Sequence, residues 1–430
     1  MLAAALLLAF VPPQEPAAAT LQAELARLVD LPSERARRLA AEQLAQKNVA
    51  ALEPWRAACA AFGEFEPLES GAQREEADLM VLGEVEHTEL HLYVPPGYDP
   101  AQPAPLLLWG HGAGGSGARQ WRPWQEIADA AGMLVLAPTE FGKVAGWGFT
   151  PRERAAQLAA LRWVRRRANI DENAIFLGGA SRGGHMTWDL ALRGADLWAG
   201  LVPCIGGPRL QIGPQNNMRY LANVAQLPIR GLQGSKDDPL LLANLHLAFE
   251  RLQRLKAPDV ELREFADLGH AYSLEGLDWA AFFAKRRTAV PARVVLRAAD
   301  LAEARSTWLR ITAFERNVAV DAAPRVSQAH WNALDDAGQR KLLLDAYDDL
   351  TAELEVKDRG SGRFAARGSG VRGFELLLTP EQLGRRGAIE VRWGSRTVRA
   401  TAEPSVATLL TEFAERFDRT FLPVTTVSIR

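Results

Sequence analysis

A serine with glycines two residues before and two residues after it is the strongest chemical signal in this chain. The segment reads Gly179-Ala180-Ser181-Arg182-Gly183, between an apolar run at 174–178 and a helix-like run that ends at Arg193. Glycines suit these positions because a strand that turns sharply into a helix leaves no room for side chains. We therefore expect Ser181 to stand exposed at the turn as a nucleophile, with an ordinary glycine-rich turn as the alternative.

A serine hydroxyl needs a general base, and the base needs a group that orients it. Asp237 follows a predicted strand at 229–233, and His270 follows another at 260–265. The carboxyl ends of parallel strands lie at one edge of a sheet, so we expect Ser181, Asp237 and His270 to meet there. The alternative for His270 is a histidine in a surface loop.

The choice of carboxylate rests on the local sequence. Asp238 is adjacent to Asp237, and Asp267 lies shortly before His270. We favour Asp237 because Asp238 precedes Pro239, and a residue in that position suits the cap of the next helix.

An acyl-transfer site also needs backbone donors for the oxyanion of its tetrahedral intermediate. The predicted strand at 105–109 runs into a glycine-rich loop at 110–115, from which we assign the N–H of Ala113. The second donor is the N–H of Arg182, directly after the nucleophile. The loop lacks the Lys-Ser or Lys-Thr ending of a phosphate-binding loop.

Other side chains near this machinery have less specific roles. We expect His111 and His185 to make structural hydrogen bonds. The guanidinium of Arg182 either pairs with a nearby carboxylate, which we favour, or selects an acidic substrate. Three loop tryptophans are candidate substrate contacts, with plain packing as the alternative for each: Trp121, Trp124 and Trp147.

Composition narrows the possible partners. Fifty Lys and Arg against 52 Asp and Glu leave a net charge of -2, which does not favour nucleic acid or an anionic membrane. Of the seven histidines only His87 and His91 have the His-x-x-x-His spacing, and we expect no metal and no cofactor. Cys59 and Cys204 predict two buried thiols, although one bridge between them stays open, and the oligomeric state is not indicated.

Four regions follow along the chain. Residues 1–19 begin with the apolar MLAAALLLAF and predict a signal peptide and export, although no basic residue precedes Arg27. Residues 20–84 predict a helical N-terminal cap, 85–289 a catalytic α/β domain, and 290–430 a separate C-terminal α+β accessory module. No later apolar run is long enough for a transmembrane helix.

The alternation of short apolar runs with helical stretches predicts a mostly parallel sheet with helices on both faces. In the α/β domain we expect strands at 90–94, 105–109, 133–137, 174–178, 200–204, 229–233 and 260–265. In the module we expect strands at 308–314, 374–378 and 388–392, a hairpin turn at 393–396, and a last helix capped by Ser405.

These motifs resemble those of a known group of enzymes. The segments YVPPGY at 93–98, HGAGGSG at 111–117, GASRGGHMTW at 179–188 and Gly269-His270 are similar to those of secreted polyhydroxybutyrate-depolymerase and feruloyl-esterase-like hydrolases. They are also similar to the catalytic domains of prolyl-oligopeptidase-type enzymes. The resemblance covers about residues 85–287 and implies the α/β-hydrolase fold with a Ser-His-Asp triad. It departs from these groups at Arg182, where many relatives carry Met or Gln, and in a C-terminal module that is no β-propeller.

The expected activity is hydrolysis of small or polymeric carboxylic esters through an acyl-enzyme intermediate. A serine peptidase of the prolyl-oligopeptidase type would use the same residues on an amide. A third possibility is a non-catalytic binding protein on a hydrolase scaffold, which has no reason to keep all three residues.

Overall fold

A computed structural model of the chain describes residues 18–47, 50–140 and 149–430. Within them, eight strands form the central sheet, in the order β1-β2-β4-β3-β5-β6-β7-β8, and from β4 to β8 the pairing is parallel. The strands are β1 (Gly71–Val81), β2 (Glu84–Val94), β3 (Ala104–Gly110), β4 (Leu134–Pro138), β5 (Ile170–Ala180), β6 (Gly200–Cys204), β7 (Ile229–Gly234) and β8 (Val260–Phe265). Each of the seven strands predicted for this domain is present, and this architecture is the α/β-hydrolase fold.

Alternate residues of the central strands bury against helices on the two faces. In β3, Leu107 and Trp109 belong to the apolar cluster that contains α4 (Gln125–Ala131) and α8 (Trp279–Phe283). Leu106 and Leu108 belong to the cluster on the other face. That face is covered by α5 (Pro151–Arg165), α6 (Arg182–Arg193) and α7 (Pro239–Arg254). The parallel strands are apolar on both faces because both faces are covered.

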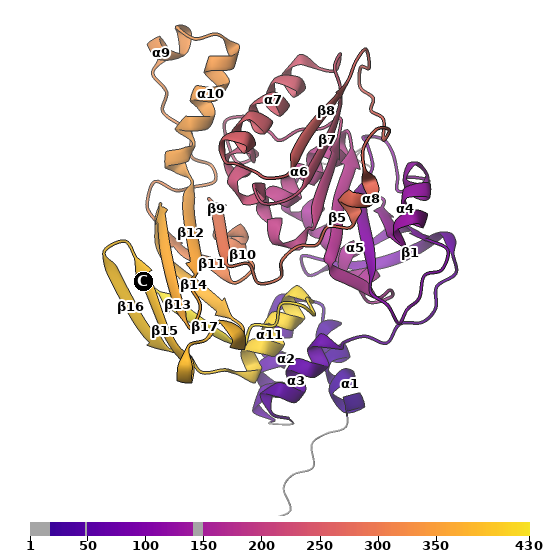
Figure 1. Cartoon of the computed structure of the whole chain (residues 1–430), viewed down its shortest axis with the longest axis vertical. Coiled ribbons are helices and arrows are strands. Elements are labelled where there is room, and N and C mark those ends of the chain that lie inside the picture. The colour runs from indigo at the N-terminus through magenta and orange to yellow at the C-terminus, as the bar shows by residue number, and fades with distance from the viewer. Residues whose placement is uncertain (1–17, 48–49, 141–148) are drawn as a thin grey trace, which may run out of the picture.

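The N-terminal region differs from the predicted helical cap. Three helices are present, α1 (Ala18–Val29), α2 (Glu34–Gln46) and α3 (Leu52–Ala60), but they pack against α11 (Val406–Arg416) near the C-terminus (Figure 1). Residues 71–81 form strand β1 at the edge of the central sheet, so the sheet begins before residue 85. The strand is hard to recognise because its alternating buried residues, Ala77, Leu79 and Val81, stand among charged residues.

Two further sheets make up the C-terminal module. A four-stranded sheet has the order β10-β11-β14-β17, and a five-stranded sheet has the order β16-β15-β13-β12-β9. Their strands are β9 (Arg293–Ala298), β10 (Arg305–Ser306), β11 (Leu309–Phe314), β12 (Ala352–Asp358), β13 (Arg363–Ser369), β14 (Val371–Leu378), β15 (Ala388–Trp393), β16 (Arg396–Thr401) and β17 (Thr425–Ile429). The predicted hairpin turn is present with Gly394 at φ +59, and the Ser405 side chain accepts from the N–H of Thr408 at the start of α11. Helices α9 (Gln328–Asn332) and α10 (Asp336–Ala346) extend from this module.

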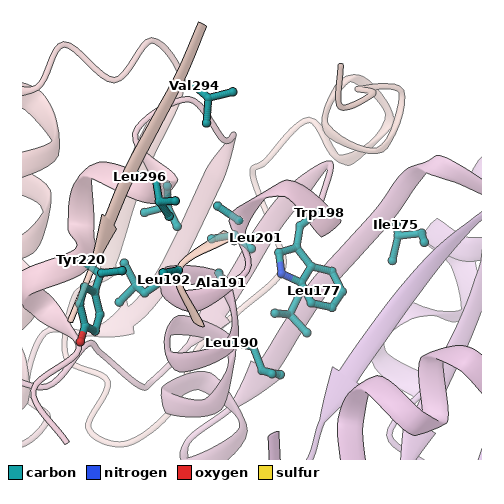
Figure 2. Packing of buried hydrophobic residues seen from close by; sticks show 14 of the residues in the cluster. Ile175, Leu177, Leu190, Ala191, Leu192, Trp198, Leu201, Tyr220, Val294 and Leu296 are labelled. Atoms are coloured by element: carbon teal, nitrogen blue, oxygen red, sulfur yellow. The ribbon is translucent and has the colours of Figure 1, made fainter. Parts of the chain in front are cut away.

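The module packs against the catalytic domain through a shared apolar core. One apolar cluster runs from β5 and α6 into β9, and Figure 2 shows Leu177, Leu192, Val294 and Leu296 within it. Buried and partly buried ion pairs cross the same boundary. They are Arg287 with Asp418, Arg419 with Glu172, Arg416 with Asp196, and Arg193 with Glu303.

Two other sequence predictions concern the cysteines and membrane-spanning helices. Cys59 and Cys204 are both free and buried, in different apolar clusters, so they do not form a bridge. Burial raises the pKa of both thiols. None of the described helices is both long enough and apolar enough to cross a bilayer.

Asp418 offers a test of how strongly the module is held. Its carboxylate lies 2.5 Å from Arg287, both side chains are buried, and the charges of Arg287 and Arg165 lower the pKa of Asp418 although burial opposes them. Asp418→Asn leaves Arg287 buried without its carboxylate, so we expect the free energy of unfolding to fall by about 3 kcal/mol. Urea denaturation followed by tryptophan fluorescence measures this.

Asp345→Asn is the matched control, because the ion pair of Asp345 with Arg251 also joins module and domain but Asp345 is exposed. This change should cost less than about 1 kcal/mol. Equal effects of the two substitutions would show that the buried pair does not hold the module.

Candidate active site

Ser181 lies at the turn between β5 and α6, in a backbone conformation that residues other than glycine rarely adopt. Its φ is +58, and its N–H donates to the carbonyl of Cys204 at the end of β6. A Cβ on Gly179 would lie 2.5 Å from the backbone of Gly183, and a Cβ on Gly183 would lie 2.1 Å from the carbonyl oxygen of Gly110. The two glycines are therefore required by the close approach of α6 to β3 and β5, and the approach forces the strained turn at Ser181.

Three side chains from three loops form a hydrogen-bonded chain. Nε2 of His270 lies 2.8 Å from Oγ of Ser181, and its Nδ1 lies 2.9 and 3.1 Å from the two carboxylate oxygens of Asp237. An ionised carboxylate only accepts, so Nδ1 carries a proton and Nε2 accepts from the serine hydroxyl. The structure thus brings together the three residues predicted from the sequence.

The surroundings of Asp237 keep it ionised. Its side chain is only 6% exposed, yet its pKa is lowered. Burial opposes this shift, but the carboxylate accepts from the N–H of Asp238 at 2.7 Å, from His270, and from Nε2 of Gln233 at 2.6 Å. The side chain of His270, in contrast, is 52% exposed, so the serine end of the chain is open to a substrate.

The side chains of Asp238 and Asp267 lie outside the hydrogen-bonded chain of Ser181, His270 and Asp237. Asp238 accepts from the N–H groups of Leu240 and Leu241 and so caps α7. Asp267 pairs with Lys236 on the surface, where both side chains are largely exposed. Gln233 was not predicted, although a glutamine inside the apolar run of β7 is a recognisable signal for a buried polar contact.

The loop after β3 lies beside the serine. A Cβ built on Gly112 would be 3.6 Å from Cβ of Ser181, so the loop passes within contact distance of the nucleophile. The backbone N–H groups of Ala113 and Arg182 have no hydrogen-bond acceptor among the described residues. Both remain available as donors.

The two flanking histidines make structural contacts. His111 is fully buried, contacts the carbonyl of Gly112 through Nδ1 and accepts from the N–H of Glu140 through Nε2. Nδ1 of His185 contacts the backbone of Gly207 in the loop after β6. These bonds hold the loops that surround Ser181.

The structure describes two of the three tryptophans that were predicted as substrate contacts. Trp124 has no exposed surface, because its ring packs edge-on against Trp109, Trp279 and Phe283, so the prediction that it contacts substrate is wrong. Trp121 is partly exposed and stacks on Tyr93 at 4.8 Å between ring centroids. Trp147 lies outside the described residues.

The favoured role for the Arg182 guanidinium is also wrong. No carboxylate lies within ion-pair distance of it in residues 18–47, 50–140 and 149–430. Its Cζ instead lies 5.0 Å from the centre of the Phe149 ring. In the same part of the chain, no three His, Cys, Asp or Glu side chains are grouped as metal ligands would be.

The sheet order and the serine turn define a protein of the α/β-hydrolase fold. No family model matches the chain. A curated bifunctional acetylxylan esterase/xylanase from Neocallimastix patriciarum is 26% identical over 157 residues, which are 35% of this chain and 22% of that protein. This chain therefore matches less than a quarter of the length of that relative.

Solved structures similar to this chain include esterases and a peptidase. A thermostable esterase has 20% identity and a TM-score of 0.40, over 50% of this chain and 63% of its own. An acetyl xylan esterase from Aspergillus awamori has 13% identity and a TM-score of 0.38, over 49% of this chain and 99% of its own. An acylaminoacyl peptidase from Pyrococcus horikoshii has 14% identity and a TM-score of 0.40, over 50% of this chain and 40% of its own.

The close approach at the serine turn can be tested by two glycine substitutions. Gly183→Ala puts a Cβ 2.1 Å from the carbonyl oxygen of Gly110, so backbone must move, and we expect a loss of at least about 2 kcal/mol in the free energy of unfolding. Gly112→Ala meets nothing closer than 3.6 Å and should cost less than about 1 kcal/mol. Urea denaturation measures both variants, and a Gly183 variant as stable as the Gly112 variant would contradict the packing described.

Proposed function

We propose that the chain is a serine hydrolase that cleaves carboxylic esters. The observation that carries the proposal is the hydrogen-bonded chain from Ser181 through His270 to Asp237, at a turn that exposes the serine. An isolated surface histidine or an ordinary turn would not need all three contacts. No cofactor enters this chemistry.

The proposed reaction proceeds in two halves. Oγ of Ser181 attacks the ester carbonyl carbon while its proton passes to Nε2 of His270, and Asp237 stabilises the imidazolium. The N–H groups of Ala113 and Arg182 hold the oxyanion. The imidazolium returns the proton to the leaving alcohol, and an acyl group stays on Ser181. A water molecule that gives its proton to Nε2 of His270 then attacks the acyl carbonyl. The bond to Oγ of Ser181 breaks, the acid leaves, and the imidazolium returns the proton to Oγ.

Export and the identity of the substrate belong to the same proposal. The apolar start of the sequence supports export, but residues 1–17 lie outside the described part of the chain. Small or polymeric esters are the proposed substrates, and turnover of p-nitrophenyl acetate beside a peptide p-nitroanilide separates an esterase from a peptidase.

Ser181→Ala removes one oxygen from an exposed turn, so we expect the variant to fold and to lose all measurable turnover of p-nitrophenyl acetate. Labelling by a fluorophosphonate probe provides a second readout, because the probe reacts only with an activated serine. A wild-type chain that is neither labelled nor active would favour the binding-protein alternative. Retention of more than a few per cent of activity in a contamination-free variant would refute the nucleophile.

Asp237→Asn keeps the shape of the side chain but removes the charge that stabilises the imidazolium, so we expect kcat to fall by about three to four orders of magnitude. Asp238→Asn is the matched control. An asparagine still caps α7, so this variant should keep activity within about threefold of wild type. The opposite pattern in the two purified variants would identify Asp238 as the orienting carboxylate.

A further inference from the structure

Two arginines lie against one aromatic ring next to the serine turn. Cζ of Arg209 is 3.8 Å from the centre of the Phe149 ring, and Cζ of Arg182 is 5.0 Å from it. Arg182 opens α6 directly after Ser181, and Arg209 lies in the loop after β6. Three segments far apart in the sequence thus bring two cations, hereafter the arginine pair, to the edge of the sheet that carries the nucleophile.

Neither member of the arginine pair has a carboxylate partner within the described residues. Arg209 donates to Oε1 of Gln215 at 3.1 Å, and Nε of Arg182 is buried without a hydrogen-bond acceptor in the part of the chain that the structure describes. Asp189 and Glu153 act on Arg209 only at longer range, and both carboxylates accept hydrogen bonds from other residues.

The two guanidinium groups also influence each other. Burial lowers the pKa of Arg209 first, and the charge of Arg182 lowers it further. The two guanidinium groups on this ring carry like charges and repel each other. An anion bound to both would reduce this repulsion. A carboxylate fits because its two oxygens match the donor fork of a guanidinium.

His185 lies beside the arginine pair, against the same phenylalanine ring. Its ring meets Phe149 edge-on, with 6.1 Å between the centroids. Its pKa is lowered to about 4, mainly by burial, and the charges of Arg209, Arg182 and His270 add to this shift although a hydrogen bond to Gly207 opposes it. His185 is therefore neutral near pH 7 and leaves the positive charge to the arginines.

We propose that the arginine pair binds a carboxylate carried by the substrate, so that the preferred esters hold a free carboxylate near the scissile bond. This inference rests on the proposed ester hydrolysis and names the substrate class of that same site. Arg182 thereby has two roles, with its backbone N–H at the oxyanion and its side chain at the substrate carboxylate.

The test compares esters that differ only in the carboxylate. On the alcohol side the pair is 3-acetoxybenzoate and 3-acetoxybenzamide, and on the acyl side it is monomethyl terephthalate and methyl 4-carbamoylbenzoate. We expect wild-type kcat/KM to favour the carboxylate by at least about tenfold in one pair. Arg209→Gln should reduce that preference by at least about fivefold.

Arg254→Gln is the matched control, because it also removes one positive charge from the catalytic domain. Arg254 lies on α7, where it pairs with the exposed Glu250. This variant should keep the wild-type preference. Preferences near one in both pairs, or a preference that Arg209→Gln leaves unchanged, would overturn the proposal while turnover of the neutral esters still supports ester hydrolysis.

A second readout does not depend on turnover. 3-Hydroxybenzoate should protect the wild-type chain from fluorophosphonate labelling better than 3-hydroxybenzamide does, and Arg209→Gln should abolish the difference. Equal protection by acid and amide would overturn the proposal even if neither ester pair is turned over. Absence of labelling in the wild-type chain would instead overturn the proposed hydrolase, and the arginine proposal with it.

Discussion

The approach of α6 to the end of β3 is the constraint on which the site depends. Gly183 and Gly110 lie so close that a single Cβ cannot fit between them, and Ser181 is pushed to a positive φ of +58. The strain has a use, because a relaxed turn would leave the hydroxyl among the side chains of the sheet edge. Once the serine is fixed there, the loops after β7 and β8 need only supply an acid and a histidine within hydrogen-bond reach.

Groups that do not react in the proposed mechanism also support the site. Gln233, the N–H of Asp238 and His270 all donate to Asp237, so the carboxylate stays ionised despite its burial. Fixed donors of this kind need no rearrangement when charge develops on the imidazole. The exposure of His270 and the burial of Asp237 thus divide the site into a reacting end and a supporting end.

The sequence predicts most of this arrangement because its signals are local. Apolar runs mark β2 to β8, and the glycines around Ser181 mark the turn. What it misses depends on distant partners. The charges of β1 hide its alternation, Trp124 is buried by rings from residues 279 and 283, and the module is joined to the domain by ion pairs such as Arg287 with Asp418. Separations of more than 100 residues leave no pattern in a single sequence.

The arginines at the boundary with the module differ from the arginine pair in their partners. At the boundary with the module, Arg193, Arg287 and Arg416 each meet a buried carboxylate, because an unpaired buried charge would be costly there. Beside Ser181, two arginines share the face of Phe149 and have no carboxylate partner in the described part of the chain. These boundary arginines have carboxylates from the chain itself, whereas the arginine pair beside the nucleophile has none among the described residues. Under the proposal, the carboxylate that the arginine pair lacks comes from the substrate.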